Sequence, residues 1–260
     1  MKKTIWMTSL GRSENAVKTL YGKIGSYGLE VKGHFWEDDL GKMAWIGPRA
    51  ELLKPEVAAW VVVGSKEELS NPSIRYGLSV LSVTVQAQRG AGFPVLLLHP
   101  RGETVDVGTL PTPLRSMEPL PVDDPGLGPK LVAKAHAPAK AALPREYRMD
   151  VYGNPQIGQW FEVGPNDGTW KGAMLGVCGA EITFHGVGPS GMLPSRSTLE
   201  YPVRGMKIDF GEKQYVAWAV QNEIGPKTSY FAKVSGAPDS LLFGSYAAGD
   251  DAEVYVVTLK

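Results

Sequence analysis

The sequence predicts a doubly wound α/β domain followed by an all-β domain. In the first hundred residues, short apolar segments rich in β-branched residues alternate with segments whose apolar residues recur at helical spacing. The stretch 106–146 then holds eight of the chain's 20 prolines. From Tyr147 onward, short β-prone segments alternate with Gly and Pro turns, which is typical of a β-sandwich or barrel.

The N-terminal elements follow the order of βαβ units, which predicts a parallel sheet with helices on both faces. The segment 57–65, VAAWVVVGS, is apolar almost throughout and suits a central strand covered on both sides. The other expected strands are residues 4–10, 29–36 and 93–100. The first expected helix begins after Ser13 as its N-cap. Two further helices are expected at residues 43–54 and 73–90.

These changes in composition give the expected domain boundaries. We expect an α/β domain at residues 1–105, a Pro-rich linker at 106–146 and a β-sandwich domain at 147–260. The linker is expected to hold one short helix around LVAKAHA, and the alternative is a long irregular excursion packed on the first domain. Strands of the last part are expected at YRMDVY, QWFEV, AMLGVC, AEITFH, MKIDF, QYVAWAV, TSYFAKV and EVYVVTL.

The C-terminal half is rich in aromatic residues, and the alternation along its strands places them mainly in a core. Exposed members would instead form a platform for a carbohydrate or a peptide. The residues concerned are Trp160, Phe161, Trp170, Phe184, Tyr215, Trp218, Tyr230, Phe231, Phe243 and Tyr246.

The overall charge excludes some classes of partner. Lys plus Arg and Asp plus Glu each number 27, so the chain has no general attraction to nucleic acid or to an anionic membrane. No stretch approaches ~20 apolar residues, the length of a membrane-spanning helix. Cys178 is the only cysteine, and the N-terminal apolar run is too short for a signal peptide. We therefore expect a cytoplasmic protein without a nucleic-acid or membrane partner.

Residues 184–191, FHGVGPSG, place Gly186, Gly188 and Gly191 in a formal G-x-G-x-x-G. A dinucleotide site needs a helix directly after these glycines, because the helix N-terminus holds the pyrophosphate. Pro194 and Pro202 follow instead, and a proline inside a helix costs ~3 kcal/mol. We therefore expect tight turns between antiparallel strands rather than a dinucleotide site.

The motifs of the first half occur in a characteristic order. IWMTS, LGRSEN and AVKTLYGKIGSYG come first, HFWEDDLGKMAW, RAELL and AAWVVVGS follow, and SKEELSNPSIRYGL and FPVLLL come last. This order resembles a Toll/interleukin-1 receptor (TIR) domain over roughly residues 4–100. The resemblance implies a flavodoxin-like fold and a tendency to self-associate.

One departure from the TIR pattern bears on activity. TIR enzymes cleave the nicotinamide–ribose bond of NAD with a glutamate that follows a Trp-Cys pair on a helix. With Ser65 and Leu78 in register with that motif, the glutamate position is Gly77 and the Trp-Cys pair is Ser73-Ile74. The resemblance therefore implies no NAD cleavage by this mechanism, although Glu67 and Glu68, earlier in the same segment, are alternative acids.

In doubly wound folds, ligands bind beyond the carboxyl ends of the strands. Arg12 and the start of the first helix would hold a phosphate there, or else form a cap and a solvated side chain. An acidic cluster follows the second expected strand, at Glu37, Asp38 and Asp39. A divalent-cation site is one interpretation of this cluster, and a solvated loop is the favoured one. The candidate ligand-binding residues at this edge are Ser9, Arg12, Ser13, Trp36, Asp38 and Ser65.

Other patterns add no catalytic centre. The four histidines are widely separated, no metal-binding spacing of His and Cys occurs, and no nucleophile–base pair can be assembled. Cys178 and His185 are expected to be core and edge residues rather than metal ligands. No catalytic residue, metal or cofactor is therefore predicted.

Together these features predict a non-enzymatic, TIR-like signalling or defence adaptor whose β-sandwich recognises a protein partner or a ligand. The expected partners are another protein or a second copy of the chain. One alternative is a nucleotide sensor or NAD-processing enzyme that uses the crevice above the first strand, with Arg12 and Ser9. Another is a carbohydrate-binding module in the C-terminal half.

Overall fold

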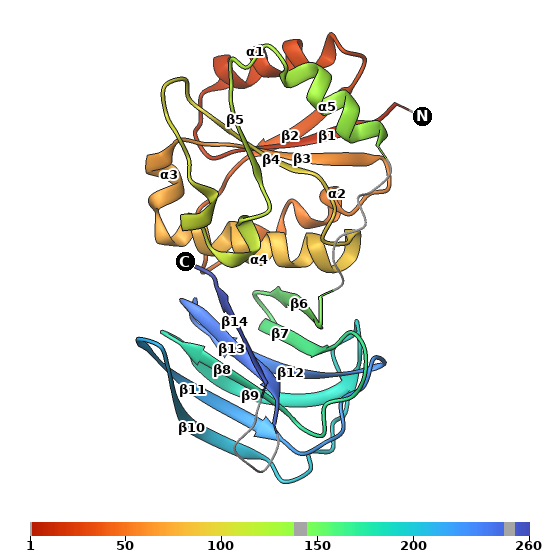
Figure 1. Cartoon of the computed structure of the whole chain (residues 1–260), viewed down its shortest axis with the longest axis vertical. Helices are drawn as coiled ribbons and strands as arrows, with labels where there is room; N and C mark the ends of the chain where they lie inside the picture. Colours follow the sequence, from red (N-terminus) through yellow and green to blue (C-terminus); the bar gives the residue numbers. More distant parts are fainter. Residues whose placement is uncertain (1, 138–144, 247–252) are drawn as a thin grey trace. The chain divides into compact units, whose positions relative to one another are not determined.

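The computed structural model describes residues 2–137, 145–246 and 253–260. The chain divides into two compact units, residues 1–40 with 44–142 and residues 41–43 with 143–260. The first unit is an α/β structure and the second is built from antiparallel strands (Figure 1). The expected fold class is therefore confirmed. None of the described helices is long and apolar enough to cross a membrane.

The first unit contains a five-stranded parallel sheet with the strand order β2-β1-β3-β4-β5. This is the flavodoxin-like order, in which the direction of winding reverses between β1 and β3. The strands are β1 (Thr4–Ser9), β2 (Glu30–Phe35), β3 (Val57–Val63), β4 (Val95–His99) and β5 (Glu118–Pro121).

Helices cover both faces of this sheet, with α1 and α5 on one side and α2 and α4 on the other (Figure 1). Ile5, Met7, Val61, Leu96 and Leu98 alternate along their strands and pack under α1 and α5. The helical elements are α1 (Glu14–Gly25), η1 (Ala44–Ile46), α2 (Arg49–Leu52), α3 (Lys66–Ser70), α4 (Pro72–Arg89), η2 (Val107–Thr109), η3 (Thr112–Leu114) and α5 (Leu127–His136).

The segment expected as a linker completes the α/β unit instead. Its high proline content favours a linker, but Pro119 and Pro121 lie in β5, at the edge of the sheet. Proline is tolerated on an edge strand, where its missing N–H would face away from the neighbouring strand. The helix expected around LVAKAHA is the second half of α5. The remainder of the expected linker includes residues 138–144, which lie outside the described residues.

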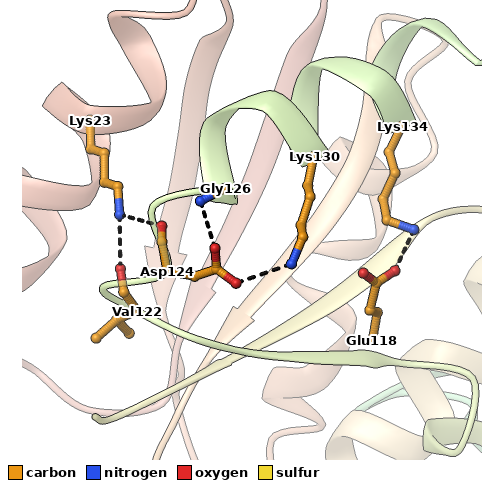
Figure 2. Close-up of polar contacts among 7 residues, drawn as sticks. All are labelled: Lys23, Glu118, Val122, Asp124, Gly126, Lys130 and Lys134. Atoms are coloured by element: carbon orange, nitrogen blue, oxygen red, sulfur yellow. Dashed lines mark hydrogen bonds and ion pairs between the residues drawn. The ribbon is translucent and has the colours of Figure 1, made fainter.

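Polar contacts hold the β5–α5 connection against α1 (Figure 2). Lys23 on α1 donates to the carbonyl oxygens of Val122 and Asp124, at 3.4 and 2.9 Å. The Asp124 carboxylate accepts from the Gly126 N–H at 2.6 Å and from Lys130 at 3.0 Å. The bond from Lys130, followed by that from Gly126, lowers the pKa of Asp124. The turn before α5 is therefore an ordered part of the unit.

The second unit is a sandwich of two antiparallel sheets, with strand orders β10-β11-β8-β13-β14 and β6-β7-β12-β9. Phe161, Trp170, Tyr215, Tyr230, Phe231 and Phe243 are buried, which confirms the expected core role for these aromatic residues. The strands are β6 (Tyr147–Asn154), β7 (Gly158–Pro165), β8 (Ala173–Cys178), β9 (Glu181–Pro189), β10 (Val203–Phe210), β11 (Lys213–Val220), β12 (Thr228–Ser235), β13 (Ser240–Ser245) and β14 (Val254–Thr258).

The three glycines of FHGVGPSG lie in and just after β9, and no helix follows them in residues 190–202. Only Gly191, with a φ of 82°, forms the expected turn. Gly186 and Gly188 lie inside the strand, which corrects the expectation of turns there. A Cβ on Gly188 would lie 2.5 Å from Pro194 Cβ, so these glycines allow residues 190–200 to pack closely on the strand.

Candidate functional site

The candidate site lies at the carboxyl edge of the parallel sheet, where the winding reverses between β1 and β3. The ends of β1, β2 and β3 are level there, because Ser9 pairs with both Phe35 and Val63. The loops after these strands therefore meet at one edge. They carry the residues that the sequence suggested as ligand contacts.

Ser65 and Glu68 form a capping box at the start of α3. The Ser65 Oγ accepts from the Glu68 N–H at 3.2 Å, while Glu68 Oε2 accepts from the Ser65 N–H at 2.7 Å. The Ser65 hydroxyl also donates to Glu68 Oε2, at 3.1 Å. The sequence S-x-x-E before a helix is the signature of this motif. The capping box accounts for the serine at position 65, and it fixes the position of the Glu68 carboxylate.

That carboxylate reaches the loop after β1. A Cβ on Gly11 would lie 2.7 Å from Glu68 Oε1, so the carboxylate packs directly over this glycine. Ser9, at the end of β1, donates its hydroxyl to the Gly11 carbonyl oxygen at 2.7 Å. The structure thus brings Ser9, Gly11, Ser65 and Glu68 together at the reversal point.

Arg12 and Ser13 lie at the same end but remain at the surface. Arg12 is exposed and makes no hydrogen bond or ion pair with another described residue. Ser13 is the N-cap residue of α1, but its side chain accepts no capping hydrogen bond. Neither side chain is therefore positioned by its neighbours.

Trp36 is a packing residue of the first unit rather than an open ligand contact. Its side chain is 5% exposed, and its ring carbon Cζ2 lies 2.6 Å from where a Cβ on Gly77 would be. Trp45, 2% exposed, borders the same position on α4. The absence of a side chain at Gly77 is therefore required by the packing of Trp36 against α4.

Asp38 connects the loop after β2 to the start of α4. The Ser73 hydroxyl donates to Asp38 Oδ2, and Asn71 Oδ1 accepts from the Ser73 N–H at 2.9 Å as the helix cap. Among the described residues, no group of three or more His, Cys, Asp or Glu side chains could hold a metal ion. Asp38 thus serves as an anchor for the helix start in this structure.

A cavity of about 520 Å³ opens beyond β4 and β5, at the same edge of the sheet. Its lining includes His99, the last residue of β4, together with Glu103 and Asp123. Glu103 also accepts from the Lys66 N–H at 2.7 Å, which ties the cavity's loop to α3. The sequence analysis missed these residues, although a histidine that ends an apolar strand segment is a usable signal.

Three aromatic rings lie side by side on the α4 side of β1 and β2. The ring centroids of Trp6 and His34 are 5.8 Å apart, and those of His34 and Trp36 are 6.4 Å apart. Both indole N–H groups and both His34 ring nitrogens are buried without a hydrogen-bond partner. Burial lowers the pKa of His34 to about 4, so the ring is neutral at pH 7.

Comparisons with known proteins do not assign this site. No protein-family model matches the chain, and a search of curated proteins finds no significant match.

Changing Gly77 to alanine tests the packing of Trp36. We expect the free energy of unfolding of the first unit to fall by about 1–3 kcal/mol, because the new methyl group overfills this contact. Pulse-labelled hydrogen exchange at increasing urea concentration, followed on α4 peptides, measures this change. In the control, Gly22→Ala on α1, no atom lies near the new Cβ, and a gain of about 0.5–1 kcal/mol is expected. A gain in Gly77→Ala as large as in Gly22→Ala would contradict the packing argument.

Proposed function

We propose that this protein acts through protein association, as a signalling or defence adaptor with a TIR-like α/β unit and a β-sandwich recognition unit. The observation that supports this proposal is the position of Gly77, whose Cβ site is bordered by Trp36 and Trp45. In the TIR-like register, this is where an NAD-cleaving enzyme would carry its glutamate. A carboxylate at this point would have to displace a buried indole.

A second candidate function is supported by Glu68. Its carboxylate lies over Gly11 at the reversal point of the sheet, where doubly wound folds bind ligands. One oxygen, Oε2, accepts from Ser65, while Oε1 lies next to the position that a Cβ on Gly11 would take. A carboxylate oxygen held in this way can accept a hydrogen bond from a ribose hydroxyl. This geometry suits a nucleotide sensor or an NAD-processing enzyme.

Incubation of the full chain with NAD separates the two candidates. For an adaptor, we expect no nicotinamide release above that of a heat-inactivated sample. Turnover that is lost in Glu68→Gln or Glu67→Gln, but kept in the control Glu212→Gln at an exposed glutamate of the second unit, would contradict the adaptor proposal and support the second candidate. Sedimentation velocity of the same sample is expected to show concentration-dependent self-association. A monomer at every concentration would remove self-association from the proposal.

A further inference from the structure

One side of the β-sandwich is formed by the edge strands β9 and β10, which belong to different sheets. Arg204 on β10 extends to His185 on β9, and its Nε donates to His185 Nε2 at 3.5 Å. The guanidinium carbon also lies 4.9 Å from the ring centroid of Trp218 on β11. The guanidinium is therefore held by an aromatic face and by a hydrogen bond from its inner nitrogen.

His185 is itself held in a fixed orientation. It is 1% exposed, and its Nδ1 lies 2.8 Å from the hydroxyl of the buried Tyr230. Burial, followed by the positive charge of Arg204, lowers the pKa of His185 to about 4. At pH 7 the ring is therefore neutral. Since Nε2 accepts from Arg204, the ring hydrogen must lie on Nδ1, from which it is donated to Tyr230.

The charge of Arg204 has no counterion among the described residues. Its side chain is exposed, and no described carboxylate forms an ion pair with it. The two terminal nitrogens make no hydrogen bond to a described residue, whereas Nε is engaged with His185. The neutral His185 does not balance the charge. Tyr230, His185 and Trp218 thus orient a cation whose outer donors face solvent.

We propose that Arg204 is a binding site for a single carboxylate group at the open side of the β-sandwich. The two free terminal NH₂ groups present parallel donors that match the two oxygens of a planar carboxylate, and one positive charge matches one negative charge. Val216, 38% exposed, lies two residues before Trp218 and on the same side of β11. It offers apolar contact to the rest of the ligand.

The carboxylate belongs either to a small organic acid or to an acidic side chain of a peptide. The proposal does not depend on the adaptor function, because it rests only on contacts within the second unit. A structural role alone would require Arg204 to close the side of the sandwich. It would not predict saturable binding of an anion.

The test follows the Arg204 Nε–Hε signal of the full chain by NMR, assigned through its loss in Arg204→Lys. Sodium acetate is titrated against acetamide and against sodium chloride at equal ionic strength. Acetyl-Ala-Glu-Ala-amide is titrated against its Gln counterpart. We expect saturable shifts with acetate and the Glu peptide only. Preference for the peptide identifies a protein-borne carboxylate, and equal affinity identifies a small acid as a sufficient ligand.

The variants are followed through signals of Trp218 and Val216. Arg204→Lys is expected to bind acetate about tenfold more weakly, because an ammonium group lacks the planar pair of donors. Tyr230→Phe keeps the charge but releases His185, and a loss of about threefold is expected from poorer positioning. Arg196→Gln, at an exposed arginine of the same unit, should leave binding unchanged. The proposal is overturned if acetamide or chloride shifts the wild-type Arg204 signal as much as acetate, or if Arg204→Lys binds acetate equally well.

Discussion

Replacing Glu162 with alanine is expected to lower the free energy of unfolding of the second unit by about 3–5 kcal/mol. Glu162 is 2% exposed and lies on β7 in the four-stranded sheet. Its carboxylate accepts hydrogen bonds from the Tyr152 hydroxyl at 2.6 Å, the Ser229 hydroxyl at 2.5 Å and the Gly191 N–H at 2.8 Å. Alanine would leave these donors without their acceptor, and the hydroxyl of the fully buried Ser229 could not turn to water instead.

The substitution also removes the charge that faces Arg148. Arg148 is half-buried on β6 and donates to the Ser229 Oγ through Nε, at 3.2 Å. Ser229 therefore connects the two charges, and the negative charge of Glu162 opposes the lowering of the Arg148 pKa by burial. Without Glu162, the guanidinium would keep its carbonyl partners but lose its counterion. The cost of leaving this half-buried charge unbalanced is the main part of the expected loss.

Pulse-labelled hydrogen exchange at increasing urea concentration measures this loss when it is followed on peptides from β7 and β12. The matched control is Glu212→Ala, at an exposed glutamate in the turn between β10 and β11. Its expected change lies within about 0.5 kcal/mol, as for other exposed substitutions. A loss in Glu162→Ala no larger than in the control would show that the hydrogen bonds of Glu162 do not stabilise the sheet.

Lowering the pH from 6.5 to 4 is expected to destabilise the second unit by about 3 kcal/mol through His185 alone. The folded protein holds the His185 pKa at about 4, whereas the ordinary value is 6.5. Between these values the unfolded chain binds a proton that the folded chain excludes, so acid favours unfolding. The stabilisation is fully present above pH 6.5, is lost as the pH falls toward 4, and changes no further below that.

The measurement is the unfolding free energy of the second unit at several pH values, for the wild type and for His185→Gln. The variant is expected to lose the pH dependence that His185 causes. The control His136→Gln, at an exposed histidine at the end of α5, should keep it. Equal pH dependence in the wild type and His185→Gln would show that His185 is not responsible. Hydrogen exchange of peptides from β1 and β2 should show that the first unit also loses stability between pH 6.5 and 4, because burial gives His34 a pKa of about 4.

The strands and helices of the first unit are largely predictable from local pattern. The strands β3 and β4 are continuous apolar runs, and α4 begins after an Asn that caps it, with proline in its first turn. The proline-rich fifth strand was not predictable from local pattern, because composition alone does not show that a segment lies at a sheet edge. Only its pairing with β4 explains how Pro119 and Pro121 fit into a strand.

The candidate sites depend on contacts between residues that are far apart in the chain, and local sequence patterns do not reveal such contacts. The sequence placed Ser9 and Ser65 at one edge, as the structure does, because both follow parallel strands. It did not predict that Trp36 packs on Gly77, which lies on a helix far along the chain. His185 is a core residue as expected, but its contacts with Arg204 and Tyr230 depend on the pairing of two sheets.

The outer border of β5 limits how copies of this protein can join. The Val122 N–H points inward to the His99 carbonyl oxygen, at 2.9 Å. Since successive N–H groups alternate in direction along a strand, positions 119 and 121 would direct theirs outward. Both are proline, so this border presents no amide hydrogen to an approaching strand. Any filament that lengthened the parallel sheet from one molecule to the next would have to start at the opposite margin, along β2.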